Sequence, residues 1–295
     1  MTDKWSSVFL TGRLDATDFI VTNLGFETQR TRSQNKDISS AFARIFYVVR
    51  GRAVFHLPKG DVEASPGHLY LIPNYVGHAY ECEPGFAAYY LFVFQRIHRQ
   101  TDIFDLYEFP TEAEGNESIE ALLETYCRTF PQLSLPPHET NAFNNHLAYH
   151  EYVEQYCNLE LFQRMQLLGL IAIVFSFFMK SGQPRVEVTD PRIADTVDYV
   201  QQHLSEPISI ETLAERACLT KSYLIRTFRE TLGLTPLQYI LQKKIQKAQT
   251  MLLGTDLSVS EVANAVGFAD ASYFIRLFRK NLGFTPQEYR AKLIE

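Results

Sequence analysis

Arginines that recur at equal spacing are the residues of this chain best suited to a specific chemistry. They are Arg226 and Arg229 in one segment, and Arg276 and Arg279 in another fifty residues later. The two segments, 222–239 and 272–289, are identical at eleven of eighteen positions. Packing alone would repeat the apolar positions, but it would not require the arginines to repeat. Because an exposed arginine can bond guanine O6 and N7 in bidentate fashion, the repeat favours two similar modules that face nucleic acid.

A helix must position these arginines in each copy. Its core stripe is predicted from apolar residues at four-residue spacing: Leu224, Phe228 and Leu232, then Phe274, Phe278 and Leu282. Gly233 and Gly283 are suited to a left-handed cap at the end of the helix. A short helix with a serine N-cap, Ser209 or Ser258, and a tight turn precede each copy. This order is typical of a helix-turn-helix motif.

The segment between the copies predicts one long helix over 236–252. Seventeen residues span roughly 25 Å, so the two recognition helices are expected about one turn of DNA apart. Its lysines, and the starts of the helices that follow Thr235 and Thr285, are suited to phosphate. The residues expected to contact phosphate are Arg229, Thr235, Lys243, Lys244, Arg279, Lys280 and Thr285.

Charge is distributed unevenly along the 295 residues. Residues 1–189 carry 15 Lys and Arg against 22 Asp and Glu, whereas residues 190–295 carry 13 against 12. The net charge of −6 therefore does not exclude nucleic acid as a partner. Four scattered cysteines offer neither a disulfide framework nor a zinc pattern. No signal peptide is recognisable, and the most apolar run, 167–179, is shorter than a membrane span, so we expect a soluble cytoplasmic protein.

The first hundred residues read as short β-strands separated by Gly and Pro turns, which favours an antiparallel sandwich or barrel. Residues 1–18 are expected to form an arm or a ragged first strand. Helices are expected from Asn116, with two longer ones over 141–156 and 159–179. The last is apolar nearly all round, so we expect it to be buried inside the domain or against a second subunit.

The motifs of residues 190–295 resemble the DNA-binding domain of the AraC/XylS family of bacterial transcription regulators. The resemblance includes Gly267-Phe268, the Ser272-Tyr-Phe segment and the ending Gly283-Phe-Thr-Pro-Gln-Glu-Tyr-Arg290. It implies seven helices in a bipartite helix-turn-helix domain. It also implies base contacts from Lys221, Ser222, Ile225, Arg226, Ala271, Ser272, Ile275 and Arg276. Ile225 and Ile275 depart from the polar readers often found there, so we expect them either to pack on a thymine methyl or to contribute little to base reading.

Residues 60–78 resemble the second half of a cupin motif, with Pro66-Gly67, Pro73 and His78 at suitable spacing. A metal-dependent cupin enzyme would also need a His-x-His and a downstream Glu. The stretch 47–56 has no His-x-His, so we expect no metal, no cofactor and no catalytic residues. A cupin enzyme fused to a DNA module is the least favoured alternative.

The expected fold class is α+β, with a cupin-like β-barrel and flanking helices followed by an all-α bipartite helix-turn-helix domain. The expected boundaries are 1–180 for a sensory and dimerisation domain, 181–189 for a linker and 190–295 for the DNA-binding domain. The expected partners are double-stranded DNA, a small-molecule effector such as a sugar or other polar metabolite, a second copy of the chain and RNA polymerase, without a membrane. The candidate effector pocket comprises Arg44, Phe46, Tyr70, His78, Tyr80, Tyr90 and Phe92. A regulator without a ligand, or one controlled by a protein partner, remains an alternative.

Overall fold

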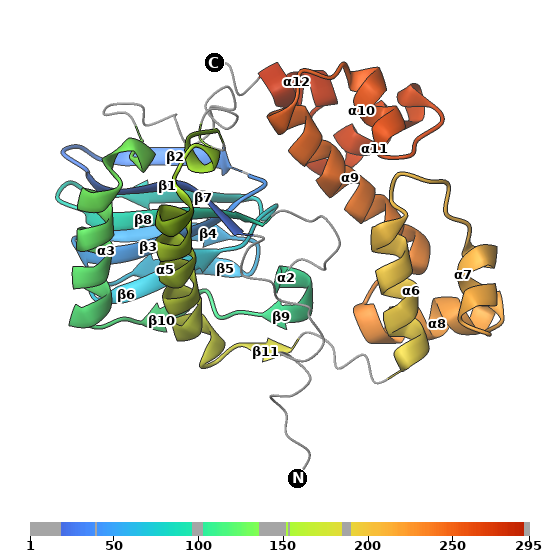
Figure 1. Ribbon diagram of the computed structural model, residues 1–295, viewed down its shortest axis with the longest axis horizontal. Helices are drawn as coiled ribbons and strands as arrows, with labels where there is room; N and C mark the ends of the chain where they lie inside the picture. The colour runs from blue at the N-terminus through green and yellow to red at the C-terminus, as the bar shows by residue number, and fades with distance from the viewer. Residues whose placement is uncertain are drawn as a thin grey trace, which may run out of the picture. The chain divides into compact units, whose positions relative to one another are not determined.

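The computed structural model describes two compact units of the chain (Figure 1). The described residues are 19–38, 40–95, 103–135, 152, 154–184 and 190–291. The N-terminal unit comprises Asp15–Arg96 and Glu108–Gln183, and the C-terminal unit includes Pro184–Glu295. The predicted arm over 1–18, most of the predicted helix over 141–156 and most of the predicted linker lie outside the described residues.

A five-stranded antiparallel sheet forms one layer of the N-terminal unit. Its strands, in spatial order, are β1 (Phe19–Thr28), β8 (Ala87–Gln95), β3 (Ala43–Arg50), β6 (His68–Ile72) and β10 (Glu112–Glu114). Gly25 of β1 lies opposite Tyr90 of β8. A Cβ on Gly25 would lie 2.2 Å from the Tyr90 hydroxyl oxygen, so a glycine is required for this ring to lie across β1.

A four-stranded antiparallel sheet forms the second layer. Its strands, in spatial order, are β2 (Ser33–Ile38), β7 (His78–Cys82), β4 (Ala53–Leu57) and β5 (Gly60–Ala64). The rings of Phe46 on β3 and Phe55 on β4 lie 5.5 Å apart, so the inner faces of the two sheets meet. In the described residues the strands form separate sheets instead of one closed barrel. The predicted α+β class is confirmed.

Short elements and two longer helices connect or follow the strands along the chain, and the first of them, α2, belongs to the C-terminal unit. They are α2 (Ile103–Leu106), the strand pair β9 (Tyr107–Glu108) with β11 (Gln183–Pro184), α3 (Glu117–Thr129), the 3-10 helix η2 (Pro131–Leu133) and α5 (Leu161–Met179). Asn116 caps α3 by accepting a hydrogen bond from the Ile119 backbone N–H at 2.9 Å. This bond satisfies one of the donors that the first turn of a helix leaves free.

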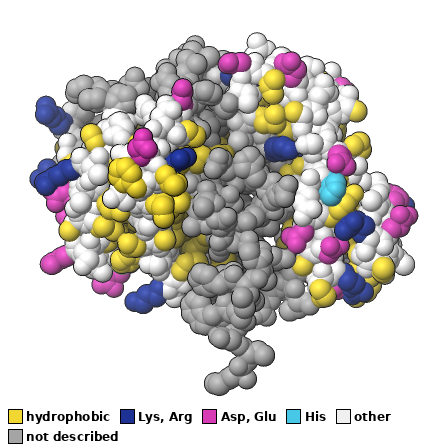
Figure 2. Space-filling model, viewed as in Figure 1, with side chains coloured by type: hydrophobic (Ala, Val, Ile, Leu, Met, Phe, Trp, Pro, Cys, Tyr) yellow, Lys and Arg dark blue, Asp and Glu magenta, His cyan; other side chains and the backbone are white. Residues whose placement is uncertain are grey.

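One side of α5 packs against β1 and β10, and the other side is open. The packed residues are Leu167, Leu170, Ile171, Val174, Phe175 and Phe178. Leu161, Phe162 and Met165 are 66%, 63% and 62% exposed. Burial inside the domain therefore holds for one face of this apolar helix, and burial of the other face against a second subunit stays a prediction. Figure 2 shows apolar side chains gathered over the part of the N-terminal unit where α3 and α5 lie. By length and composition α5 could also cross a membrane, although one of its faces packs on the sheet.

Seven helices lie within residues 190–291 of the C-terminal unit. They are α6 (Pro191–Gln202), α7 (Ile210–Arg216), α8 (Lys221–Leu232), α9 (Pro236–Gly254), α10 (Val259–Ala265), α11 (Ala271–Leu282) and α12 (Pro286–Ala291). Asp190 caps α6 through a bond from the Arg192 backbone N–H, and Pro191 occupies the first helical position. Proline suits this position because its missing N–H would have had no partner inside the helix.

The same aromatic contact holds together each copy of the repeat. Phe228 of α8 meets Tyr239 of α9 edge to face, with ring centroids 5.6 Å apart. Phe278 of α11 meets Tyr289 of α12 in the same way at 5.4 Å. Edge-to-face pairs stabilise a core beyond their buried area. The shared Phe and Tyr of the repeat therefore build the core of each module.

Candidate functional site

The helices α8 and α11 hold the repeated arginines and begin and end in equivalent ways. Thr220 caps α8 and Asp270 caps α11, each accepting a hydrogen bond from a backbone N–H of the first turn. Gly233 and Gly283, with φ of 72° and 82°, end the two helices in the left-handed conformation. Glycine adopts this conformation without steric cost, which explains the sharp end of each helix.

Most predicted base-contacting side chains lie on the outer face of these helices. Leu224, Phe228, Phe274 and Phe278 are fully buried beneath them. The exposed members of the predicted set are Lys221, Ser222, Ile225, Arg226, Ser272 and Arg276, and the half-buried members are Ala271 and Ile275. Each helix therefore presents an exposed serine, Ser222 or Ser272, one turn before an exposed arginine, Arg226 or Arg276, and this pair suits contact with a base edge.

The two copies differ in how their cationic side chains are engaged. In the first copy, Lys221 pairs with Glu211 of α7, and Arg226 lies 4.0 Å from Glu230. The Arg226 guanidinium also lies 5.0 Å from the centre of the Tyr223 ring. In the second copy, Arg276 forms no ion pair with the described residues. The acidic partners of the first copy thus offset part of its positive charge.

Five members of the predicted phosphate set lie on or near the surface. Arg229, Arg279 and Lys280 are exposed. Thr235 and Thr285 are half-buried at the starts of α9 and α12, where each forms reciprocal bonds with the residue three positions later. The hydroxyls of both threonines are therefore already engaged as caps, and only nearby backbone N–H groups are suited to a phosphate.

Lys243 and Lys244 correct the prediction, because both are buried. They are only 6% and 4% exposed, so neither side chain is placed to contact a phosphate. Lys243 Nζ lies 5.6 Å from the centre of the Tyr239 ring. Lys244 Nζ donates to the carbonyls of Glu206, Val266 and Gly267 at 3.1, 2.9 and 2.9 Å. The inner side of α9 packs into the domain, and these lysines lie on that side.

The interior between the two sheets is largely aromatic and includes several residues of the candidate effector pocket. Phe46, Tyr80 and Phe92 are each 2% exposed or less, and Phe46 lies within about 6 Å of both other rings. The Tyr90 ring is tilted by 39° to the Phe92 ring, with centroids 5.4 Å apart. The candidate pocket residues on these strands therefore do come together, apart from the Tyr70 hydroxyl. That hydroxyl donates to Glu112 Oε1 at 2.7 Å and accepts from the Ser65 N–H.

Arg44 adds a cation to this aromatic interior. It is fully buried, and its guanidinium lies 5.1 and 5.0 Å from the ring centres of Phe42 and Phe92. Burial lowers its pKa to about 10, an effect that the charges of Tyr80 and Glu27 oppose. Cation–π contacts of this kind strengthen when they are removed from water.

The charge of Arg44 affects the pKa values of Glu27 and His78. Burial raises the pKa of Glu27 to about 7, although the positive charge of Arg44 opposes the rise. Burial and then the Arg44 charge lower the pKa of His78 to about 3. Glu27 Oε1, His78 Nε2 and Asn23 Nδ2 are buried without a hydrogen-bond partner in the described residues. The sequence prediction included His78 but missed Glu27 and Asn23, which only the register of β1 brings inside.

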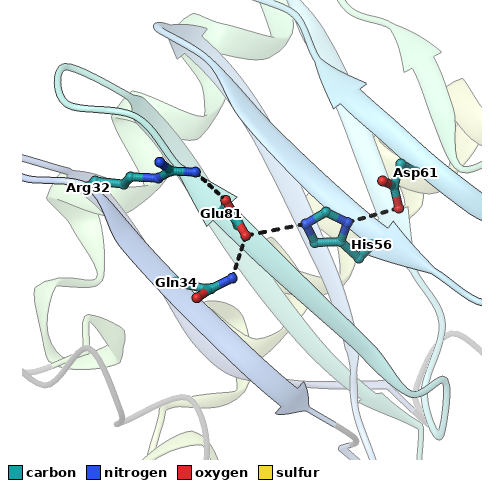
Figure 3. A network of polar contacts seen from close by, with 5 residues as sticks. All are labelled: Arg32, Gln34, His56, Asp61 and Glu81. Carbon is teal, nitrogen blue, oxygen red and sulfur yellow. Dashed lines mark hydrogen bonds and ion pairs between the residues drawn. The ribbon is translucent and has the colours of Figure 1, made fainter.

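A second polar cluster lies on the outside of the four-stranded sheet (Figure 3). Arg32 donates to Glu81 at 2.7 Å, and Gln34 donates to the other oxygen of that carboxylate. His56 lies between Asp61, at 2.8 Å, and Glu81, at 3.8 Å. In this exposed network, His56 has a structural role, because it links Asp61 of β5 to Glu81 of β7. No group of three His, Cys, Asp or Glu suited to a metal occurs in the described residues.

Comparisons with known proteins assign the C-terminal unit. Residues 213–292 match the model of a helix-turn-helix domain family. Over 86 residues the chain is 36% identical to the transcriptional activator RhaS of Escherichia fergusonii, covering 29% of this chain and 31% of that protein. Over 104 residues it is 26% identical to the lactose operon transcription activator of Staphylococcus xylosus, covering 35% and 37%. The matches thus span about a third of these curated relatives.

Solved structures add two similarities. The DNA-binding domain of AdpA, in complex with a target DNA, is 37% identical; the match covers 34% of this chain and 91% of that one, with a TM-score of 0.34. ToxT from Vibrio cholerae O395 is similar over 94% of this chain and 98% of its own, with a TM-score of 0.50 and 11% identity, a likeness of fold alone.

The C-terminal unit is therefore a helix-turn-helix domain of the kind found in transcription regulators. The predicted resemblance to the DNA-binding domain of AraC/XylS regulators is confirmed for this domain.

Proposed function

We propose that this protein is a sequence-specific regulator of transcription that reads DNA with α8 and α11. The observation that carries the proposal is the pair of outer faces. The first helix presents exposed Ser222 and Arg226, with Phe228 buried beneath them. The second presents Ser272 and Arg276 at the equivalent positions, with Phe278 buried beneath them. Folding explains the phenylalanines, whereas the exposed arginines have no role in either core. Readout of base edges in the major groove gives them one.

The test is selection of duplexes from a random pool by the full chain. Wild-type protein should enrich a bipartite sequence, with half-sites about one helical turn apart. Its affinity should fall linearly with the logarithm of salt concentration, because bound counterions are released from DNA. Enrichment of no sequence, with equal affinity for all duplexes, would refute specific regulation of this kind.

The proposed input is a small polar effector bound between the two sheets. Support comes from the mixture of aromatic rings with unsatisfied polar atoms. His78 Nε2 offers a lone pair and Asn23 Nδ2 offers protons. Asn23 on β1 and Arg44 on β3 both lie directly opposite Phe92 of β8, which is the strand between them. Hydroxyl groups can donate to the histidine and accept from the amide, so a sugar or another hydroxylated metabolite fits this chemistry.

A panel of monosaccharides and small hydroxy acids provides the probe for the effector. A ligand that binds only the folded state raises the free energy of unfolding with its concentration. Wild-type protein should be stabilised by one class of the panel, and Asn23→Leu should lose most of that gain. If no compound stabilises the protein, control without a ligand or by a protein partner becomes the better proposal.

The open face of α5 is proposed to pair with a second copy of the chain. Its large exposed apolar residues are Leu161, Phe162, Met165 and Ile173. Contiguous apolar area of this kind commonly marks an interface in soluble proteins. A twofold pair of chains would present two DNA-binding domains to a target site.

A further inference from the structure

The ammonium group of Lys244 lies where the two helix-turn-helix modules meet. Its three hydrogen-bond acceptors come from different parts of the C-terminal unit. The Glu206 carbonyl belongs to the loop between α6 and α7, in the first module. The carbonyls of Val266 and Gly267 follow α10, in the second module. A lysine ammonium has three N–H donors, so this arrangement uses all of them and ties both modules to α9.

The surroundings of Lys244 allow little adjustment. Gly267 has φ of 77°, and a Cβ built on it would lie 2.4 Å from Lys244 Nζ and 2.8 Å from the Ser205 carbonyl oxygen. The second module therefore approaches the first so closely that a side chain at Gly267 would separate them. The Phe268 ring, next along the chain, lies 5.5 Å from the same ammonium.

Burial of a charge at this junction is unfavourable unless hydrogen bonds replace water. Desolvation, with a smaller contribution from Lys247, lowers the pKa of Lys244 to about 8. An apolar side chain would fill the same space without the cost of desolvation. The three bonds to fixed carbonyls instead impose a direction, because each must lie near its donor axis.

The consequence concerns the relative placement of α8 and α11. Both recognition helices are joined through α9, so a rotation of either module about α9 changes where its helix meets DNA. We propose that Lys244 is a positioning residue that holds the two modules in one mutual orientation and so sets the spacing of half-sites that the chain accepts. This inference rests on the proposed DNA-binding function.

Lys247 offers a matched control within the same helix. Its ammonium donates to the Ser205 hydroxyl of the first module at 2.8 Å, and among the described residues it has no acceptor in the second module. Replacement of Lys247 therefore takes a half-buried lysine from α9 but leaves the three hydrogen bonds of Lys244 intact. A general effect of lost charge near DNA would appear in both lysine variants.

The experiment uses the full chain and the duplex that wild-type protein selects, together with duplexes in which one or two base pairs are inserted between the half-sites. One inserted base pair turns one half-site against the other by about 35°. For wild-type protein we expect at least a tenfold loss of affinity. For Lys244→Met we expect a loss below about threefold, with unchanged affinity for a single half-site; such a shift is within the range of single base-pair discrimination. Lys244→Arg should restore much of the wild-type penalty, and Lys247→Met should keep it.

Two results would overturn the inference, and they are distinguishable. If wild-type protein selects a bipartite duplex and Lys244→Met keeps the full tenfold penalty, Lys244 stabilises the domain without setting the spacing, and the DNA-binding function stands. If wild-type protein selects no duplex, the proposed function fails and this inference fails with it. Circular dichroism checks that each variant is folded, and Lys244→Gln takes the place of Lys244→Met if the latter does not fold.

Discussion

The Nδ1 atom of His78 lies 2.9 Å from the carbonyl oxygen of Val76, and this contact fixes the tautomer of a buried ring. A carbonyl oxygen only accepts, so Nδ1 carries the proton and donates it. The other ring nitrogen, Nε2, then has a lone pair that faces the interior between the sheets. Burial is the main cause of the low pKa of His78, and protonation of Nε2 would in addition place a second positive charge near Arg44.

His78 should make the protein sensitive to acid. Its pKa falls from 6.5 to about 3 on folding, so its contribution to stability is present above pH 6.5 and is lost as pH falls towards 3. The slope from this group is up to about 1.4 kcal/mol per pH unit. His78→Gln should remove that slope in denaturation curves of the full chain at pH 4.5–7. An unchanged slope would show that the imidazole is not held neutral.

Glu27 should have the opposite effect over part of the same range. Its pKa rises from 4.5 to about 7 on folding, so its contribution is present below pH 4.5 and is lost as pH rises through 7. The full effect is about 3 kcal/mol. Glu27→Gln mimics the protonated carboxyl and should therefore be more stable than wild type at pH 8 but not at pH 4.5. Equal differences at both pH values would contradict this prediction.

The sequence was sufficient to predict the C-terminal unit because the two copies can be compared position by position. Positions such as Phe228 and Phe278 repeat for packing, and the remaining repeated residues then indicate the outer face. Lys244 has no such check, because α9 occurs between the copies. A lysine in a helix looks exposed in sequence, and only the packed structure places three carbonyls around this one.

The N-terminal unit was predicted less completely. Alternation identified the aromatic interior, including Phe46 and Phe92, because each strand has one inner face. It did not identify Glu27, since a bulge between Val21 and Asn23 shifts the register of β1. For α5, composition alone could not distinguish a helix buried all round from one that packs on a sheet along a single face.

The open face of α5 predicts an assembly that a single charge should disrupt. Met165 is 62% exposed, so Met165→Lys should leave the fold intact while it places an ammonium group in an apolar interface. Wild-type full chain should sediment as a dimer at micromolar concentration, and the variant should sediment as a monomer. Glu117→Lys on the exposed side of α3 adds the same type of side chain elsewhere and should remain dimeric. A monomeric wild-type protein would remove the proposed role of α5.

The ion pair between Lys221 and Glu211 predicts that the first module is restrained before it meets DNA. Glu211→Gln should release the lysine and remove a negative charge near the phosphates. Affinity should rise by a small factor, about two- to fivefold, because exposed pairs are worth under about 1 kcal/mol. Glu261→Gln on α10 removes a charge from the second module, where Ala271 replaces the lysine, and tests whether net charge alone explains the gain. Equal gains for both variants would exclude a specific effect of the pair.

Arg276 provides the sharpest test of base reading, because it is exposed and no ion pair holds it within the described residues. Arg276→Ala should cost about 1–3 kcal/mol on the selected duplex and relax discrimination at one base pair. Arg279→Ala, one turn further along the same helix, should weaken binding to all duplexes alike and reduce the salt dependence. Titrations of matched and mismatched duplexes at two salt concentrations separate these outcomes. An equal loss on every duplex for Arg276→Ala would assign that arginine to the phosphates and leave the sequence to be read by its neighbours on α11.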